Sequence, residues 1–241
     1  HALRFLLAHY PAAYSVDRTA GANPIRQPLD NLNEAGTLYG PIIYQKAPVV
    51  MRQLEGLVGE VAFRDGLREY LDAYRYGNAS WPDLIDILDR QTSENLENWS
   101  AVWIDEPGRP TVEARLELDA NGQVSGATVF QDDPADLGRV WPQELELLLR
   151  YDGRDRRLPV SLRSSSVFVD GLETSVPIVV LPNAGGLEYG RFRLDVRTRE
   201  TLLATLPEIA DPLTRGIGWV TLWDGLLHGE VAVTDWFELL L

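Results

Sequence analysis

The stretch from Thr37 to Glu55 combines polar side chains that could do chemistry with a strong helical pattern. Tyr44 and Lys46 lie near its start, and Lys46 is the only lysine among strongly basic side chains that are otherwise all arginine. A tyrosine hydroxyl can donate a hydrogen bond to developing negative charge, although most tyrosines on amphipathic helices are simply packed residues. Apolar residues at steps of three and four predict one buried face. They are Ile43, Ala47, Val50 and Leu54.

The residues around Tyr44 resemble a known enzyme family. The segment from Tyr44 to Ala47, Tyr-Gln-Lys-Ala, is similar to the Tyr-Glu-Lys-Gly helix of the M1 (gluzincin) zinc aminopeptidases. In that family a His-Pro-Ile segment precedes this helix, as Asn23-Pro24-Ile25 does here. Further matches follow at the family's spacings: Gly59-Glu60, Phe63, Gly66-Leu67, Tyr70-Leu71, Tyr74, Asn78-Ala79, Asp83-Leu84, Leu88, Leu96, Trp99, Trp103-Ile104 and Gly108-Arg109-Pro110.

The resemblance implies a role for Tyr44. In M1 enzymes the tyrosine of this helix donates its hydroxyl to the oxyanion that forms as zinc-bound water attacks the scissile carbonyl. Tyr39, five residues earlier, is a candidate for the pocket wall, with a packed aromatic as the simpler interpretation. The segment departs from the family at Gln45 and at Ala47-Pro48. Because proline disrupts a helix interior, the helix proper should start near Ala47, or kink there.

The zinc motif of the family is absent from this sequence. That motif needs His-Glu-x-x-His on one helix, whereas the histidines here are His1, His9 and His228. The Gly-x-Met-Glu-Asn signature that holds the substrate amino group is also absent. We therefore expect no metal site in this chain, and expect zinc and the peptide substrate to bind in an intact parent protein.

Two acidic stretches could be mistaken for metal ligands. Leu32 to Gly36, Leu-Asn-Glu-Ala-Gly, resembles the motif that supplies the family's third zinc ligand, but Glu34 lies far too close to Tyr44 in the sequence. Asp132, Asp133 and Asp136 could bind calcium, yet they lack EF-hand spacing and predict a solvated turn.

Composition limits the partners and the compartment. The chain has 241 residues, a net charge of −14 and no cysteine. The negative charge argues against nucleic acid or an anionic membrane as the main partner, and the absence of cysteine excludes disulfides and thiolate sites. No apolar run is long enough for a membrane span, and the first residues lack a signal-peptide pattern, so the compartment stays open. Helical patterns at both ends suggest an excised fragment that packs against a missing N-terminal half.

Residues 1–108 predict short antiparallel helices. Ala2 to Leu7 should be the end of one helix, with Pro11 after it and an irregular segment from Tyr14 to Leu38. A helix is expected over residues 60–75. Ser80, with Asp83 three residues later, predicts the start of the next helix, and Ser93 should cap another.

The pattern changes after Pro110 to a period of two. Strands are expected at 112–118, from Val124 onward, and at 144–151, 158–162, 175–181 and 189–196, with a type I′ hairpin at Asn121-Gly122. This spacing predicts an antiparallel β-sandwich. Helices should follow at 199–206, from Asp211-Pro212 onward and after a cap at Thr234. The fold class is therefore α+β and multidomain, with domains at 1–108, 109–198 and 199–241.

Three functional hypotheses follow. The first is part of an M1-like zinc aminopeptidase in which Tyr44 stabilises the oxyanion, inactive as this chain alone. The second is a non-catalytic M1-like scaffold for protein interactions. The third is an unrelated helical protein with a carbohydrate-binding type of sandwich, although clustered aromatic residues are missing from its strands.

Overall fold

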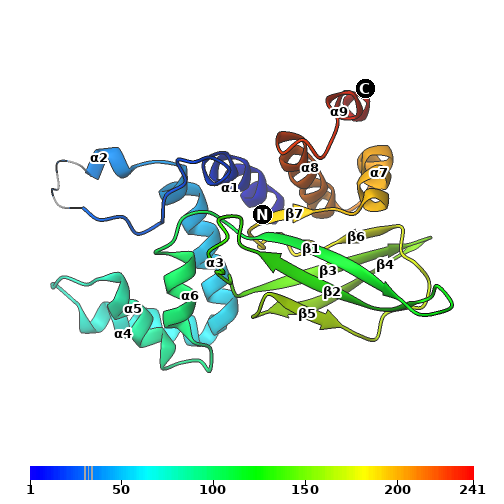
Figure 1. Ribbon diagram of the computed structural model, residues 1–241. Coiled ribbons are helices and arrows are strands. Elements are labelled where there is room, and N and C mark those ends of the chain that lie inside the picture. The colour runs from blue at the N-terminus through cyan, green and yellow to red at the C-terminus, as the bar shows by residue number, and fades with distance from the viewer. Residues whose placement is uncertain (30, 32, 34) are drawn as a thin grey trace.

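The computed structural model describes residues 1–29, 31, 33 and 35–241. Helices form both ends of the chain and two β-sheets form its middle, which confirms the α+β fold class (Figure 1). The first helical part comprises α1 (Ala2–Asp17), α2 (Ala35–Leu38), the π-helix η2 (Ile42–Lys46), α3 (Ala47–Val58), α4 (Glu60–Ala73), α5 (Trp81–Asp89) and α6 (Leu96–Trp103).

Helix α1 is much longer than the sequence predicted. It continues through Pro11 to Asp17, so the expected end near Leu7 is wrong. The buried positions Leu6, Tyr10, Ala13, Tyr14 and Asp17 recur at steps of three and four and pack onto the rest of the protein. Packing of this face outweighs the backbone hydrogen bond that Pro11 cannot donate.

The capping box at Ser80 is present as predicted. Asp83 Oδ2 accepts hydrogen bonds from the Ser80 backbone N–H at 2.8 Å and from Ser80 Oγ at 2.6 Å. The predicted cap at Ser93 is wrong, because Asn95 Oδ1 accepts from the Asn98 N–H and starts α6. Asparagine and serine are both good N-caps, so the local sequence does not choose between them.

Ser80→Ala is expected to lower the free energy of unfolding by about 1 kcal/mol, the usual cost of losing a serine N-cap. Ser80 is exposed, so the substitution creates no cavity. The midpoint of urea unfolding measures this change. Ser93→Ala is the matched control and should leave the midpoint unchanged; equal effects of the two substitutions would contradict the prediction.

The middle of the chain forms two sheets. The first has the strand order β5-β2-β1-β7 and the second β4-β3-β6. The strands are β1 (Thr111–Leu118), β2 (Val124–Asp132), β3 (Gln143–Tyr151), β4 (Arg154–Leu162), β5 (Ser166–Val169), β6 (Val179–Leu181) and β7 (Arg191–Arg193). All pairs are antiparallel except β1 with β7, which is parallel.

The β1–β2 hairpin is present, but its turn is not the predicted type I′. Gly122 has a φ of 76°, while Asn121 is not among the residues with positive φ, so a two-residue I′ turn does not form. Asp119 organises a longer loop instead. Its Oδ1 accepts from the N–H groups of Asn121 and Gln123 at 2.8 and 2.9 Å.

The buried apolar side chains form two clusters, one on each face of the second sheet. Strand β3 contributes to both clusters, because successive side chains of a strand point to opposite faces. Leu148 packs with the helices, whereas Leu147 and Leu149 pack against the first sheet. The helical cluster also includes side chains of α7 (Val196–Thr205) and α8 (Pro212–Leu227). Since this cluster runs through all three segments, the domain division at 108 and 198 stays a prediction.

Helix α8 lies beside α1, although the two are far apart in the sequence (Figure 1). Asp211 caps α8 as predicted, accepting from the Thr214 N–H at 2.9 Å. Helix α9 (Val233–Leu240) starts after Ala232, so the predicted cap at Thr234 is wrong by two residues. Within the described part of the chain, none of the helices combines the length and hydropathy that crossing a membrane requires.

Candidate functional site

The π-helix η2 carries Tyr44 immediately before α3. Its wider turn is visible in the hydrogen bond from the Ala47 N–H to the Ile42 carbonyl, five residues back. The extra residue shifts the helical phase, so Ile42 and Lys46 are buried and Ile43 is only partly buried. Of the predicted stripe, Val50 and Leu54 are buried, whereas Ile43 and Ala47 are only partly buried. The predicted irregularity before Ala47 is present. Such π-turns often occur at functional sites.

Tyr44 and Tyr39 lie together on the surface. Their side chains are 54% and 64% exposed, and their ring centroids are 5.8 Å apart. Tyr44 is therefore not a core residue in this chain, which removes the simplest packing explanation for it. Its catalytic role and the pocket role of Tyr39 stay predictions.

Lys46 points the opposite way, into the interior. It is fully buried, and Nζ lies 3.0 Å from Asp17 Oδ2 and donates to the Gly108 carbonyl at 2.6 Å. Nζ also lies 5.5 Å from the centroid of the Tyr189 ring. Burial lowers the pKa of Lys46, and the Asp17 carboxylate opposes that shift. Lys46 thus links α1, the segment after α6 and the segment before β7.

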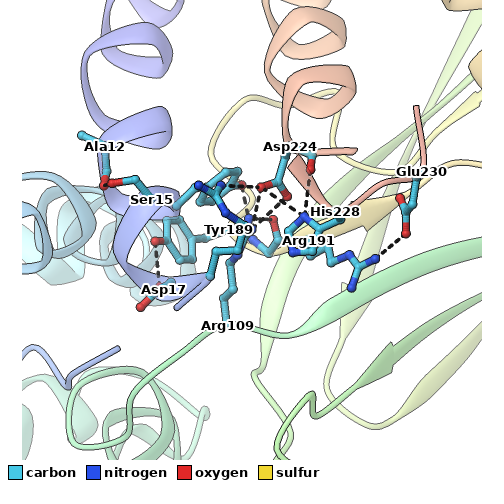
Figure 2. Close-up of polar contacts among 12 residues, drawn as sticks. Ala12, Ser15, Asp17, Arg109, Tyr189, Arg191, Asp224, His228 and Glu230 are labelled. Atoms are coloured by element: carbon cyan, nitrogen blue, oxygen red, sulfur yellow. Dashed lines mark hydrogen bonds and ion pairs between the residues drawn. The ribbon is translucent and has the colours of Figure 1, made fainter. Parts of the chain in front are cut away.

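Asp17 and Tyr189 complete this buried cluster. Tyr189 donates its hydroxyl to Asp17 Oδ2 at 2.8 Å (Figure 2). Burial raises the pKa of Tyr189 well above its usual value, so the phenol stays neutral and remains a donor. Asp17 therefore accepts from two donors at one oxygen.

A second buried ion pair lies beside the first. Arg109 donates to both carboxylate oxygens of Asp224 at 2.7 and 2.9 Å and to the Gly190 carbonyl at 3.0 Å (Figure 2). Its guanidinium carbon lies 3.8 Å from the centroid of the Tyr14 ring. Arg109 and Asp224 side chains are 4% and 6% exposed. The pair joins the segment before β1 to α8.

Comparison with known proteins identifies the first helical part. Residues 2–103, which include η2 and Tyr44, match the family model described as the peptidase family M1 domain. Residues 2–103 are thus similar to an M1 peptidase domain. This result confirms the resemblance seen in the sequence and argues against the hypothesis of an unrelated helical protein.

Aminopeptidases from other organisms resemble the chain along different lengths. Aminopeptidase N of Streptomyces lividans is 27% identical in an alignment that covers 95% of this chain and 28% of that protein. Aminopeptidase N of Lactobacillus delbrueckii subsp. lactis is 30% identical over 57% of this chain and 16% of that protein. Puromycin-sensitive aminopeptidase of Caenorhabditis elegans is 30% identical over 51% and 13%. The chain thus spans less than a third of each of these relatives.

The side chains that could bind a metal are dispersed over the described residues. Across residues 1–29, 31, 33 and 35–241, no cluster of three or more His, Asp or Glu side chains could hold a metal ion. His9 contacts the Phe5 ring in α1, whereas His228 Nδ1 lies 2.8 Å from the Asp224 carbonyl at the end of α8. Leu32 and Glu34, in the rejected zinc-ligand motif, lie outside the described residues.

The acidic stretch after β2 is not a simple solvated turn. Asp132 and Asp136 are exposed, but the side chain of Asp133 is only 3% exposed. Both of its oxygens accept hydrogen bonds from Arg139, at 2.9 and 2.7 Å. Asp133 therefore organises the loop by pairing with an arginine, an interaction that spacing alone could not separate from calcium binding.

The stability conferred by Asp133 should depend on pH. Hydrogen bonding to Arg139 holds the pKa of Asp133 well below its usual range. A carboxylate with a lowered pKa in the folded state stabilises the protein above its unfolded pKa of about 4, and this contribution is lost as pH falls. Asp133→Asn should cost about 1.5–3 kcal/mol at pH 7, and progressively less below pH ~4.

Urea unfolding at pH 7, 5 and 3 tests this expectation. Asp136→Asn is the matched control, because Asp136 is exposed and its φ of 56° suits asparagine equally well. A cost for Asp133→Asn that stays constant or grows as pH falls would overturn the prediction.

A cleft of about 500 Å³ lies elsewhere, between the β3–β4 hairpin and α7. Its lining includes Arg150, Asp155, Thr201 and Glu208, and no residue of η2. Arg150 and Asp155 already pair with each other at 2.7 Å. The cleft is an open groove between surface charges, and the Tyr44 surface is the better candidate for chemistry.

Proposed function

We propose that this chain is part of an M1-type zinc metallo-aminopeptidase that removes N-terminal residues from peptides. The observation that carries the proposal is the position of Tyr44. The M1 match includes this residue, a π-helix precedes α3 at this point, and the side chain is half exposed. Zinc, peptide substrate and the remaining catalytic groups are assigned to the complete protein, because this sequence lacks the family's His-Glu-x-x-His motif.

The chemistry assigned to Tyr44 is stabilisation of an oxyanion. When a nucleophile adds to the scissile carbonyl, negative charge develops on the carbonyl oxygen. A phenol fixed at that position donates a hydrogen bond that strengthens as the charge develops, and therefore stabilises the transition state more than the substrate. A hydroxyl at the surface of this chain is suited to this role only if another part of the protein excludes water around it.

The exposed surface of Tyr39 and Tyr44 is accordingly proposed to face the N-terminal half of the enzyme. Tyr39 would then form part of the pocket wall through its ring, next to the Tyr44 hydroxyl. In this arrangement the chain alone is inactive, because it supplies an oxyanion donor without the zinc-binding motif or the amino-group anchor.

Zinc content and peptidase activity test the proposal. The complete protein that carries this chain should bind one zinc and cleave aminoacyl p-nitroanilides, and should leave the N-acetylated substrates intact. The isolated chain should do neither. A complete protein without zinc and without activity would overturn the proposal and support the alternative, a non-catalytic M1-like scaffold.

A further inference from the structure

We propose that Lys46 is the positioning residue for Tyr44: its buried ammonium fixes the π-helix in the geometry that presents the Tyr44 hydroxyl. Asp17 and Tyr189 hold Lys46 in place. This inference rests on the proposed function of Tyr44, and it assigns a task to the only lysine in the chain.

The first observation is that Tyr44 and Lys46 share one short element. Both lie in η2, two residues apart, and side chains at that spacing do not share a helix face. Tyr44 is 54% exposed while Lys46 is 0% exposed. The contacts that hold the Lys46 side chain in the interior therefore also determine the direction in which the Tyr44 side chain points.

The second observation is the number of separate segments that hold Lys46. Its ammonium contacts Asp17 of α1, the Gly108 carbonyl between α6 and β1, and the Tyr189 ring before β7. Tyr189 in turn fixes Asp17 through its hydroxyl. Segments far apart in the sequence thus converge on one nitrogen at the end of the π-helix.

The third observation is the cost of this arrangement. A π-turn is a rare conformation, and a buried ion pair is often no more stabilising than apolar side chains of similar volume. Stability alone therefore does not explain a buried lysine in a chain whose other strong bases are all arginines. A compact ammonium on a thin stem can reach three partners inside the core, where a planar guanidinium requires more room. We therefore infer that Lys46 serves to fix the conformation of η2.

A double-mutant cycle in the complete protein tests the inference. Lys46→Met alone would leave the Asp17 carboxylate buried and unpaired, so the test uses Asp17→Asn combined with Lys46→Met. This pair variant should lower kcat by about 10²–10³, as expected for loss of one oxyanion donor, with KM changed less than about threefold. Adding Tyr44→Phe to this pair variant should lower kcat by a further factor of less than about three. The reason is that a hydroxyl already displaced from the oxyanion contributes little to catalysis, so its removal has a small effect.

The other buried ion pair provides a matched control. Among the described residues, Arg109 binds Asp224 and the Gly190 carbonyl and stacks on the Tyr14 ring, and none of these groups belongs to η2. Arg109→Met combined with Asp224→Asn should retain kcat within a few-fold, and Tyr44→Phe should show its full effect in that background. A full effect of Tyr44→Phe in the Asp17 and Lys46 pair variant as well would overturn the inference.

Hydrogen exchange separates this inference from the proposed function. In the Asp17 and Lys46 pair variant, amide exchange should speed up at least tenfold in the peptide covering η2 and stay unchanged in the second half of α3. If Tyr44→Phe alone is silent, the proposed function fails, whatever the exchange result. If exchange in η2 is unchanged, Lys46 does not fix the π-helix and the positioning inference fails, even where Tyr44 proves essential.

Discussion

Tyr44→Phe in the complete protein is expected to lower kcat by about 10²–10³, the typical cost of removing one oxyanion donor. The substitution removes a single oxygen and keeps the ring that lies against Tyr39. Because the hydroxyl acts on charge that develops only in the transition state, kcat and kcat/KM should fall together and KM should change little. Steady-state kinetics on an aminoacyl p-nitroanilide measure both constants.

Stability should be nearly unaffected by this substitution. Tyr44 is half exposed, so removing its hydroxyl creates no cavity, and surface substitutions of this kind usually stay within about 0.5 kcal/mol. Zinc content and thermal midpoint should therefore match those of the unmodified protein. Tyr76→Phe, at a fully exposed tyrosine between α4 and α5, is the control and should retain full activity. Equal activity of the two variants would show that Tyr44 is not a catalytic donor.

Arg109→Met is expected to lower the free energy of unfolding by about 3–5 kcal/mol, the usual cost of leaving one member of a buried ion pair without its partner. The change removes both hydrogen bonds to Asp224, the bond to the Gly190 carbonyl and the stacking on Tyr14. Arg18, whose Nη1 lies 3.8 Å from Asp224 Oδ1, is a poor substitute because its side chain is itself partly exposed.

Urea unfolding followed by circular dichroism measures this loss, which is a large part of the 5–15 kcal/mol stability typical of folded proteins. Adding Asp224→Asn should restore much of it, because the double variant no longer buries an uncompensated charge. A double variant as unstable as Arg109→Met would show that packing of the arginine, and not the unpaired carboxylate, sets the cost.

Local signals in the sequence predicted local structure well. Ser80 with Asp83, and Asp211 with Pro212, start helices because a cap needs only residues within one turn. The predicted end of the first helix before Pro11 is wrong, because the packing that keeps α1 helical beyond this residue comes from segments distant in the sequence. Strand β5, with four residues and only partial burial, was missed for lack of a pattern, and the parallel partner of β7 lies far away in the sequence.

Some residues of the candidate site could be recognised in the sequence, and others only in the folded structure. Lys46 attracted notice as the only lysine, and Tyr44 through its similarity to the M1 helix. Asp17 and Tyr189 gave no comparable signal, because Asp17 lies in a segment predicted to be irregular and Tyr189 at the start of a predicted strand, and neither position forms a recognisable motif. Only the folded chain brings both of them to the lysine.

Helix α1 lies against α8, although the two come from opposite ends of the chain (Figure 1). Gly216 of α8 leaves room for Leu3, because a Cβ at that position would overlap the leucine side chain. The part of α1 that packs against α8 is therefore synthesised long before α8 itself. This contact can form only after α8 has been made, so the packing of α1 is completed late in synthesis.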